Sequence, residues 1–132
     1  MQTFLPYPDY QKSAACLDKR RCWKQVLEAR QLINGSFPNH PAAKMWRGYG
    51  NALKQYYNVF LLECLDVRGI DTTLTQEPVV DVIQPSWLGN EEFHSCHRVA
   101  LLTKDPVWYG RFGWAEKVDY NYKYLWPKGE RK

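Results

Sequence analysis

Two imidazoles and a guanidinium occur close together in the segment FHSCHRVALLTKDPVWYGRFGW, residues 93–114. His94, His97 and Arg98 follow helical spacing, so a helix from about 90 to 104 places them on one face together with Leu101. Such polar groups beside an apolar residue suit the edge of a pocket, where they orient a phosphate or a ring edge. We therefore predict a site for an anionic or hydrogen-bonding ligand. A buried, hydrogen-bonded histidine is the alternative for either imidazole alone.

The order His94, Cys96, His97 also raises the question of a metal site. Cys96 lacks the helical spacing of a ligand, and no second cysteine or carboxylate group that would complete a metal site is obvious nearby. Metal is therefore disfavoured, and no cofactor is expected. The chain contains no Walker loop, GxGxxG, GxSxG or HExxH motif, which argues against nucleotide hydrolases, dehydrogenases and proteases.

A second concentration of charge lies between residues 18 and 33. Arg20, Arg21 and Lys24 recur within about one turn, and cationic side chains at this spacing can follow a phosphate backbone. Glu28 stands one turn after Lys24, where its carboxylate could assist chemistry on a bound sugar phosphate. A solvated helix face with an exposed Lys24–Glu28 ion pair explains the same residues, so both interpretations stay open.

Aromatic residues make up 15% of the chain, which suggests that some rings face a ligand. Trp46 beside Arg47, and Trp108 beside Tyr109, offer stacking surfaces of the kind that hold unstacked bases. Core packing is the alternative, and it is favoured for Trp46. The tail, residues 115–132, alternates aromatic and basic residues. It suits either a platform for single strands or a strap packed over the core.

The elements that must position these groups are mostly helical. Residues 1–8 contain two prolines and are expected to form an extended arm. Asp9 or Ser13 is the expected cap of a first short helix. The basic segment forms a helix over about 18–33, which ends at Asn34-Gly35.

The strongest periodic pattern runs from about residue 41 to 68. Apolar residues recur there at steps of three and four, which predicts one long core helix that Gly48 and Gly50 loosen near its start. Residues 70–89 are expected to form an irregular connection with an extended stretch at 79–83. The predicted fold is all-α: residues 1–132 form a compact single domain of about three principal helices with long irregular loops.

Charge and cysteine content restrict the partners and the compartment. The net charge of +4 favours a polyanionic partner, though weakly. The four cysteines form no CxxC pair, and no signal peptide or apolar stretch of membrane-spanning length is present in the sequence. We expect a cytoplasmic monomer with reduced thiols and no contact with a membrane.

The order of these motifs resembles the pyrimidine-dimer DNA glycosylase family, the group of bacteriophage endonuclease V. The resemblance rests on a short arm before a basic helix, on WRGYGNALKQYYNVFLLECLDVRGI followed by DTT, and on the ending built around Lys104, Pro106, Trp108, Tyr109 and Gly113-Trp114. The chain is also similar to small bacterial and viral proteins that begin MQTFLPYPD and are grouped with this family.

The resemblance implies an all-α protein that binds duplex DNA, extrudes a nucleotide and cleaves its glycosidic bond. In the family, an N-terminal α-amine forms an imine with the deoxyribose, and a glutamate on the first basic helix assists it. Here Gln2 disfavours removal of the initiator, so the amine belongs to Met1. Trp23 stands close to the place expected for the glutamate, and Gln25 and Glu28 are the nearest alternatives.

We therefore predict a DNA N-glycosylase that acts on a damaged or modified base and has weak AP-lyase activity. The alternatives are a catalytically inert nucleic-acid-binding relative and a protein-interaction module. The predicted catalytic residues are Met1, Arg21, Glu28, His94 and Arg98. The predicted contacts to DNA are Arg20, Lys24, Gln25, Arg47, His97, Lys104, Trp108 and Tyr109.

Overall fold

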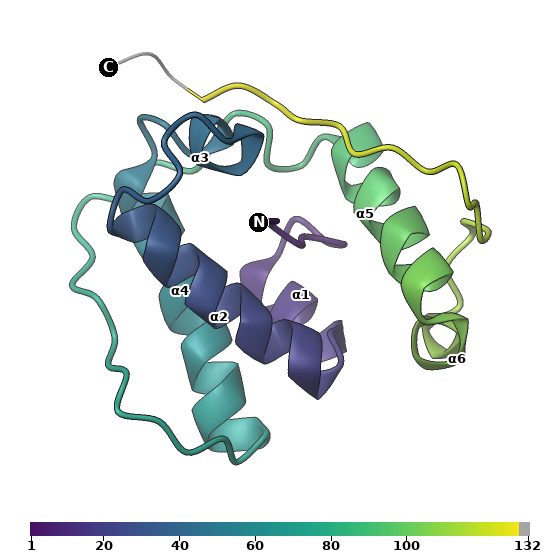
Figure 1. The fold of residues 1–132 in the computed structure, drawn as a ribbon, viewed down its shortest axis with the longest axis horizontal. Coiled ribbons are helices and arrows are strands. Elements are labelled where there is room, and N and C mark those ends of the chain that lie inside the picture. Colours follow the sequence, from purple (N-terminus) through teal and green to yellow (C-terminus); the bar gives the residue numbers. More distant parts are fainter. Residues whose placement is uncertain (130–132) are drawn as a thin grey trace.

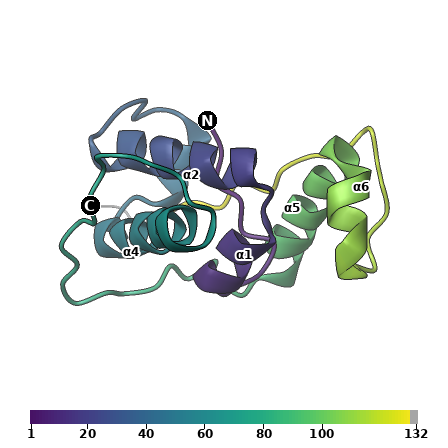
Figure 2. The same ribbon diagram turned by 90° about the horizontal axis from the view of Figure 1, so that it is seen from below.

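Two groups of helices flank the N-terminal arm in the computed structural model, which describes residues 1–129 (Figures 1 and 2). Within that range every regular element is a helix, which confirms the predicted all-α class. The first group comprises α1 (Tyr10–Cys16), α2 (Lys19–Ile33), α3 (Pro41–Met45), α4 (Gly50–Leu62) and a π-helical turn (Glu63–Val67). The second comprises α5 (Glu91–Lys104), α6 (Pro106–Tyr109) and a 3-10 turn (Gly110–Phe112).

Short polar side chains begin the helices that carry the predicted site residues. Asp9 caps α1 by accepting the N–H of Lys12 at 2.8 Å, so it is the first-helix cap, and Ser13 is buried within the helix. Asp18 accepts from the N–H of Arg21 at the start of α2, and Asn90 caps α5 in the same way. These side chains satisfy backbone donors that have no partner within the helix.

The prediction of one continuous helix over residues 41–68 is wrong, because the structure divides this segment. The chain forms α3, leaves helical geometry at Trp46–Tyr49, and resumes as α4. Gly48 causes the break because its φ of 84° lies in the left-handed region, which interrupts a right-handed helix. The periodic apolar residues still reach the core, since Met45, Tyr49, Tyr56 and Phe60 are all buried.

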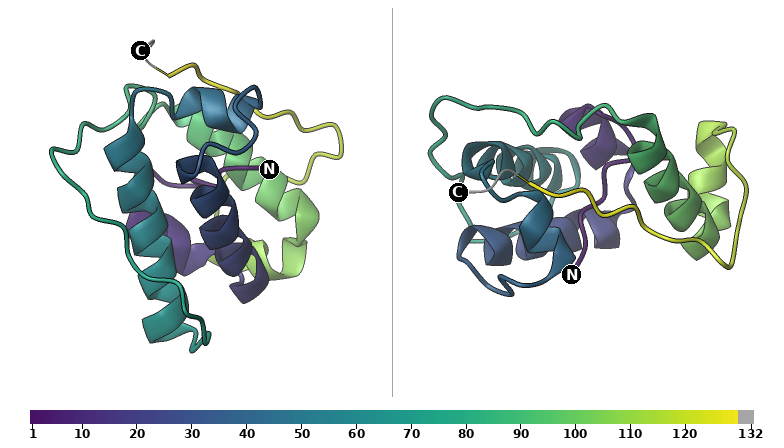
Figure 3. Two further views of the ribbon diagram at one scale, coloured as in Figure 1. Left: turned by 60° about the vertical axis from the view of Figure 1, so that its left-hand side comes forward. Right: turned by 90° about the horizontal axis from the view of Figure 1, so that it is seen from above.

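The connection between the two helical groups is irregular, as predicted, but it is fastened along α4 (Figure 3). The side chain of Asn58 binds both backbone groups of Glu77, donating to its carbonyl at 2.8 Å and accepting its N–H at 2.7 Å. The Tyr57 hydroxyl donates to the carbonyl of Thr75. These bonds replace the ladder that a regular element would supply.

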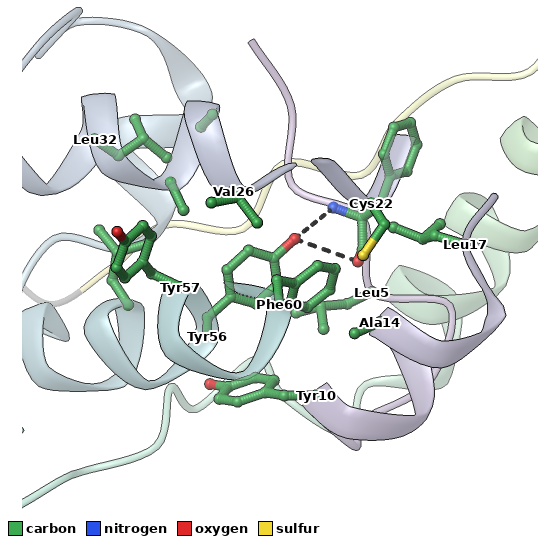
Figure 4. Packing of buried hydrophobic residues seen from close by; sticks show 14 of the residues in the cluster. Leu5, Tyr10, Ala14, Leu17, Cys22, Val26, Leu32, Tyr56, Tyr57 and Phe60 are labelled. Carbon is green, nitrogen blue, oxygen red and sulfur yellow. Dashed lines mark hydrogen bonds between the residues drawn. The ribbon is translucent and has the colours of Figure 1, made fainter. Parts of the chain in front are cut away.

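The core of the first group is largely aromatic, and it continues into the arm. Tyr56 is buried on α4 between Tyr10 and Phe60, with ring centroids 5.6 Å and 4.2 Å away (Figure 4). The Tyr56 hydroxyl accepts the N–H of Phe4 at 3.2 Å, and Leu5 of the arm is fully buried. The arm is therefore part of the packed interior.

The tail crosses α5 and reaches α3 as a strap (Figures 1 and 3). The N–H of Leu125 points to Cys96 Sγ at 3.3 Å, and the N–H of Gly129 donates to the carbonyl of Lys44 at 3.0 Å. A Cβ on Gly129 would collide with the backbone of Arg47, so only glycine permits this approach. Of the predicted tail, residues 130–132 lie outside the described residues. Within residues 1–129 no helix has the length and apolar character needed to cross a membrane.

Candidate active site

A cavity of about 710 Å³ opens where the arm passes α2 and the end of α5. Polar and charged side chains dominate its walls, and one aromatic residue of the tail, Tyr124, contributes to them. The lining residues are Met1, Gln2, Phe4, Asp18, Arg20, Arg21, Lys24, Gln25, Glu28, Lys104, Asp105 and Tyr124. Seven of the predicted site residues therefore meet here: Met1, Arg20, Arg21, Lys24, Gln25, Glu28 and Lys104.

The α-amine of Met1 lies beside a carboxylate in this cavity. Its nitrogen is 3.8 Å from Oε1 of Glu28, a buried residue of α2. The other carboxylate oxygen, Oε2, accepts the N–H of Gln2 at 3.0 Å and the Gln25 amide at 3.4 Å. The two oxygens are thus differentiated: Oε2 is held by the protein, and Oε1 faces the amine. A carboxylate held in this way can receive a proton from the amine.

A chain of hydrogen bonds links this pair to the core. Gln25 Oε1 accepts from the Tyr56 hydroxyl at 2.6 Å and from the N–H of Phe4 at 3.2 Å. The same amide group donates to Glu28, so Gln25 touches the arm, α2 and α4 at once. Satisfied buried networks of this kind are rigid, because each lost bond leaves a polar group unpaired. Gln25 thus orients Glu28, a role that its predicted contact with DNA did not include.

The cavity has an excess of positive charge. Four basic side chains and the α-amine face three carboxylates. One carboxylate, Asp18, is already engaged with Arg21 at 3.2 Å and with the hydroxyl of Tyr109. Burial alone would raise the pKa of Asp18, but the hydrogen bonds from Tyr109 and Arg21 hold it below its usual value. Arg20, Lys24 and Lys104 are exposed at the rim, where they can meet a polyanion.

The sequence predicts that His94, His97 and Arg98 border a ligand pocket. In the structure these three residues do not line the cavity. All three are buried, and their polar atoms bind the arm. His94 Nδ1 lies 2.7 Å from the carbonyl oxygen of Leu5, and His97 Nδ1 accepts the N–H of Leu5 at 2.8 Å. Arg98 donates to the carbonyl of Pro6 at 2.7 Å. The arm backbone therefore occupies these groups, and both rings are buried and hydrogen-bonded, which is the alternative that the sequence leaves open.

The remaining predicted contacts to DNA also lie outside the cavity. Arg47 is exposed in the turn between α3 and α4, where it donates to the carbonyl of Pro38. Tyr109 is fully buried, and its hydroxyl binds Asp18. Trp108 is half-buried, donates its indole N–H to the carbonyl of Cys16 at 2.9 Å and carries Arg111 against its ring face. Tyr109 is therefore a supporting residue of the site rather than a stacking surface.

The residues of the site that the sequence does not single out include Phe4, Asp18 and Asp105 of the cavity wall, and three more that shape the site. Gln2 presents its N–H to Glu28, Tyr56 anchors Gln25, and Tyr124 lines the cavity from the tail. Tyr124 belongs to the aromatic tail that the sequence did single out. The contribution of Gln2 is a backbone group, which side-chain patterns do not reveal.

The histidines and cysteines form no metal centre in the part of the chain that the structure describes. Both histidines of α5 are engaged with the arm. Cys22 and Cys64 are fully buried free thiols, and their sulfur atoms lie 3.4 Å apart between α2 and the π-helical turn.

The comparisons with known proteins give a match for the first part of the chain. The family model described as pyrimidine dimer DNA glycosylase matches residues 1–77, which include the arm, Gln25 and Glu28. The match stops before residues 93–114, which carried the most specific part of the predicted resemblance. No curated protein and no solved structure matches the chain. Because the matched residues span more than half of its length, the chain belongs to the pyrimidine dimer DNA glycosylase family.

Proposed function

We propose that this protein is a monomeric DNA N-glycosylase that removes a damaged or modified base at the basic cavity. The observation that carries the proposal is the α-amine of Met1 at 3.8 Å from Glu28 Oε1. A nucleophile beside an oriented base is the arrangement that covalent catalysis requires. The family supports DNA as the substrate. Arg20, Lys24 and Lys104 are placed at the rim to contact its phosphates.

In the proposed reaction, the neutral amine of Met1 attacks C1′ of an extruded nucleotide. The glycosidic C–N bond breaks, and the base leaves with its electron pair and takes up a proton from solvent. Glu28 Oε1 takes the proton that the attacking nitrogen loses and returns it to O4′ as the C1′–O4′ bond breaks, which leaves a protonated imine between Met1 and the opened sugar. Loss of a C2′ proton from that imine would expel the 3′ phosphate, and this is the source of the weak strand cleavage that we expect.

Base release from an ultraviolet-irradiated duplex tests the proposal, with uracil-containing and alkylated duplexes as further substrates. Glu28→Gln should slow base release by about 100-fold or more, since a positioned general base contributes at least that much. Asp66→Asn, which removes an exposed carboxylate outside the cavity, is the matched control and should leave the rate unchanged. An unchanged rate in Glu28→Gln would remove the proposed base.

The nucleophile is tested separately, by trapping with borohydride on damaged DNA. The adduct should map to Met1, and a Gly-Ser extension before Met1 should abolish it while leaving DNA binding intact. An adduct on Lys24 or Lys104, the exposed lysines that also line the cavity, would overturn the assignment. Base release without any adduct would indicate a water-using, monofunctional glycosylase. A protein that binds DNA but releases no base would be the inert relative.

A further inference from the structure

The arm is held from two sides, and the side formed by α5 has no role in the proposed reaction. On one side Glu28, Gln25 and Tyr56 bind the backbone of residues 2–4. On the other side His94, His97 and Arg98 bind the backbone of Leu5 and Pro6. Figures 1 and 2 show the arm between α2 and α5, so it connects the two helical groups.

The two histidines bind both backbone groups of a single residue. His97 accepts the N–H of Leu5, and His94 contacts the carbonyl oxygen of the same residue. They lie three positions apart on α5, so they project from one face of the helix. An extended chain reverses its N–H and carbonyl directions at every residue. A slip of one residue would therefore break both bonds, and the pair defines the register of the arm.

Hydrogen bonding also fixes the protonation state of both rings. His94 Nε2 accepts the N–H of Gly89 at 2.9 Å, so its single proton is on Nδ1 and is donated to Leu5. His97 Nδ1 accepts from Leu5 and must be unprotonated. Burial, with smaller contributions from the neighbouring His94 and Arg98, lowers the pKa of His97 to about 3. Neither ring can gain a proton without losing a bond to the protein.

Arg98 completes the contact and is itself held in place. Its guanidinium binds Glu91 on the same helix and Glu116 of the tail, while Nη1 reaches the carbonyl of Pro6. Ser95 donates to the same Glu116 at 2.8 Å. The tail thereby fixes the guanidinium that holds the arm.

We propose that His94, His97 and Arg98 form an arm clamp that positions the Met1 amine against Glu28. The proposal rests on the proposed function, because it assigns the clamp to the placement of that nucleophile. An extended chain advances about 3.3 Å per residue, so a slip of one residue would move the amine away by about the length of its present contact with Glu28. The clamp residues are positioning residues, and the sugar is contacted only at the far end of the arm.

The reactivity of the amine reports its position without any need for catalysis. Acylation of Met1 by a succinimidyl ester near neutral pH, measured by peptide mass spectrometry, should be slow in the wild type, where the amine is paired within the cavity. His97→Leu removes the acceptor of the Leu5 N–H and should raise the rate about tenfold. His97→Asn restores an acceptor oxygen near the position of Nδ1 and should return the rate to within about twofold of the wild type. Exposed Lys19 serves as the internal reference.

Two further measurements keep the result decisive if His97→Leu fails to fold. Arg98→Lys, which cannot reach Pro6 and both glutamates together, should raise the labelling rate by an intermediate factor of about three. In the wild type, the Leu5 amide should exchange its hydrogen more slowly than the Asn121 amide of the exposed tail. Equal labelling of Met1 in the wild type, the clamp variants and the surface control Glu92→Gln would overturn the proposal, as would rapid exchange at Leu5.

Catalysis separates this proposal from the proposed function. In an active enzyme, the clamp variants should lower kcat for base release and leave KM nearly unchanged, because the basic rim of the cavity is intact. If the wild type releases no base but the clamp variants still expose Met1 to labelling, the clamp stands and the proposed activity falls. If base release depends on Glu28 but the labelling rate of Met1 is the same in the wild type and the clamp variants, the proposed activity stands and the clamp is refuted.

Discussion

His97→Asn should make the protein less sensitive to acid. In the folded protein the ring of His97 is fully buried and neutral, and its pKa of about 3 lies well below the ordinary value of 6.5. Between these two values only the unfolded chain binds the proton. The free energy of unfolding therefore falls as the pH falls below about 6.5, and the loss continues down to about pH 3. Asparagine does not titrate, so the variant lacks this contribution.

The magnitude follows from proton linkage. Each pH unit within this window costs about 1.4 kcal/mol of unfolding free energy. From about pH 8 to about pH 5, His97 alone should remove about 2 kcal/mol, because only the last 1.5 units or so lie below its unfolded pKa. Burial also lowers the pKa of His94, so the wild type should lose more than this amount, and the variant should keep only the share of His94.

Urea unfolding followed by tryptophan fluorescence measures this difference. The free energy of unfolding of the wild type and of His97→Asn should be determined at intervals from about pH 8 to about pH 5, where few carboxylates titrate. The difference in free energy of unfolding between the wild type and the variant should change by about 2 kcal/mol from about pH 8 to about pH 5, because only the wild type carries the His97 contribution. Parallel curves would refute the reasoning, since they would mean that His97 takes up no proton on unfolding in this range.

Three further predictions address the cavity, the thiol pair and the tail. Lys24→Ala should reduce the slope of log affinity for duplex DNA against log salt concentration by about one. The same substitution of exposed Lys12 on α1 should leave this slope unchanged. Oxidation by a diazene such as diamide, which takes up the two thiol hydrogens, should join Cys22 to Cys64 within one molecule without forming dimers. The crosslink spans 42 positions and should raise the free energy of unfolding by up to about 4 kcal/mol. A protein mass unchanged by the treatment would show that no disulfide forms. Gly129→Ala should release the end of the tail from α3, which faster trypsin cleavage at Lys123 would report; equal cleavage would contradict the close approach.

Sequence reasoning found what local patterns encode. The expected cap Asp9 and the helix starts expected near residues 18 and 90 agree with the structure, because the beginning of a helix depends on residues within one turn. The basic helix was found with its carboxylate, since Glu28 and its cations share that helix. The long helix was predicted too long because the apolar period continues across Gly48 although the backbone does not.

The contacts of the arm could not be predicted, because they join residues far apart in the sequence. His97 and Leu5 are separated by 92 positions, and no local pattern states that they meet. The sequence did identify a polar stripe on α5 that needed a partner. The pattern predicts a phosphate as that partner, because imidazole and guanidinium groups bind carbonyl oxygens and phosphate oxygens by the same kind of hydrogen bond.

The clamped arm has a consequence for how the protein matures during synthesis. The ribosome makes Met1, Gln25 and Glu28 early, but it makes His97 about ninety residues after the Leu5 that His97 holds. Closing so long a loop is among the slower events of folding. We therefore expect a growing chain to carry the amine and its carboxylate without fixing their geometry. A fragment of residues 1–77, the part that the family model matches, should remain in that immature condition however well its helices fold.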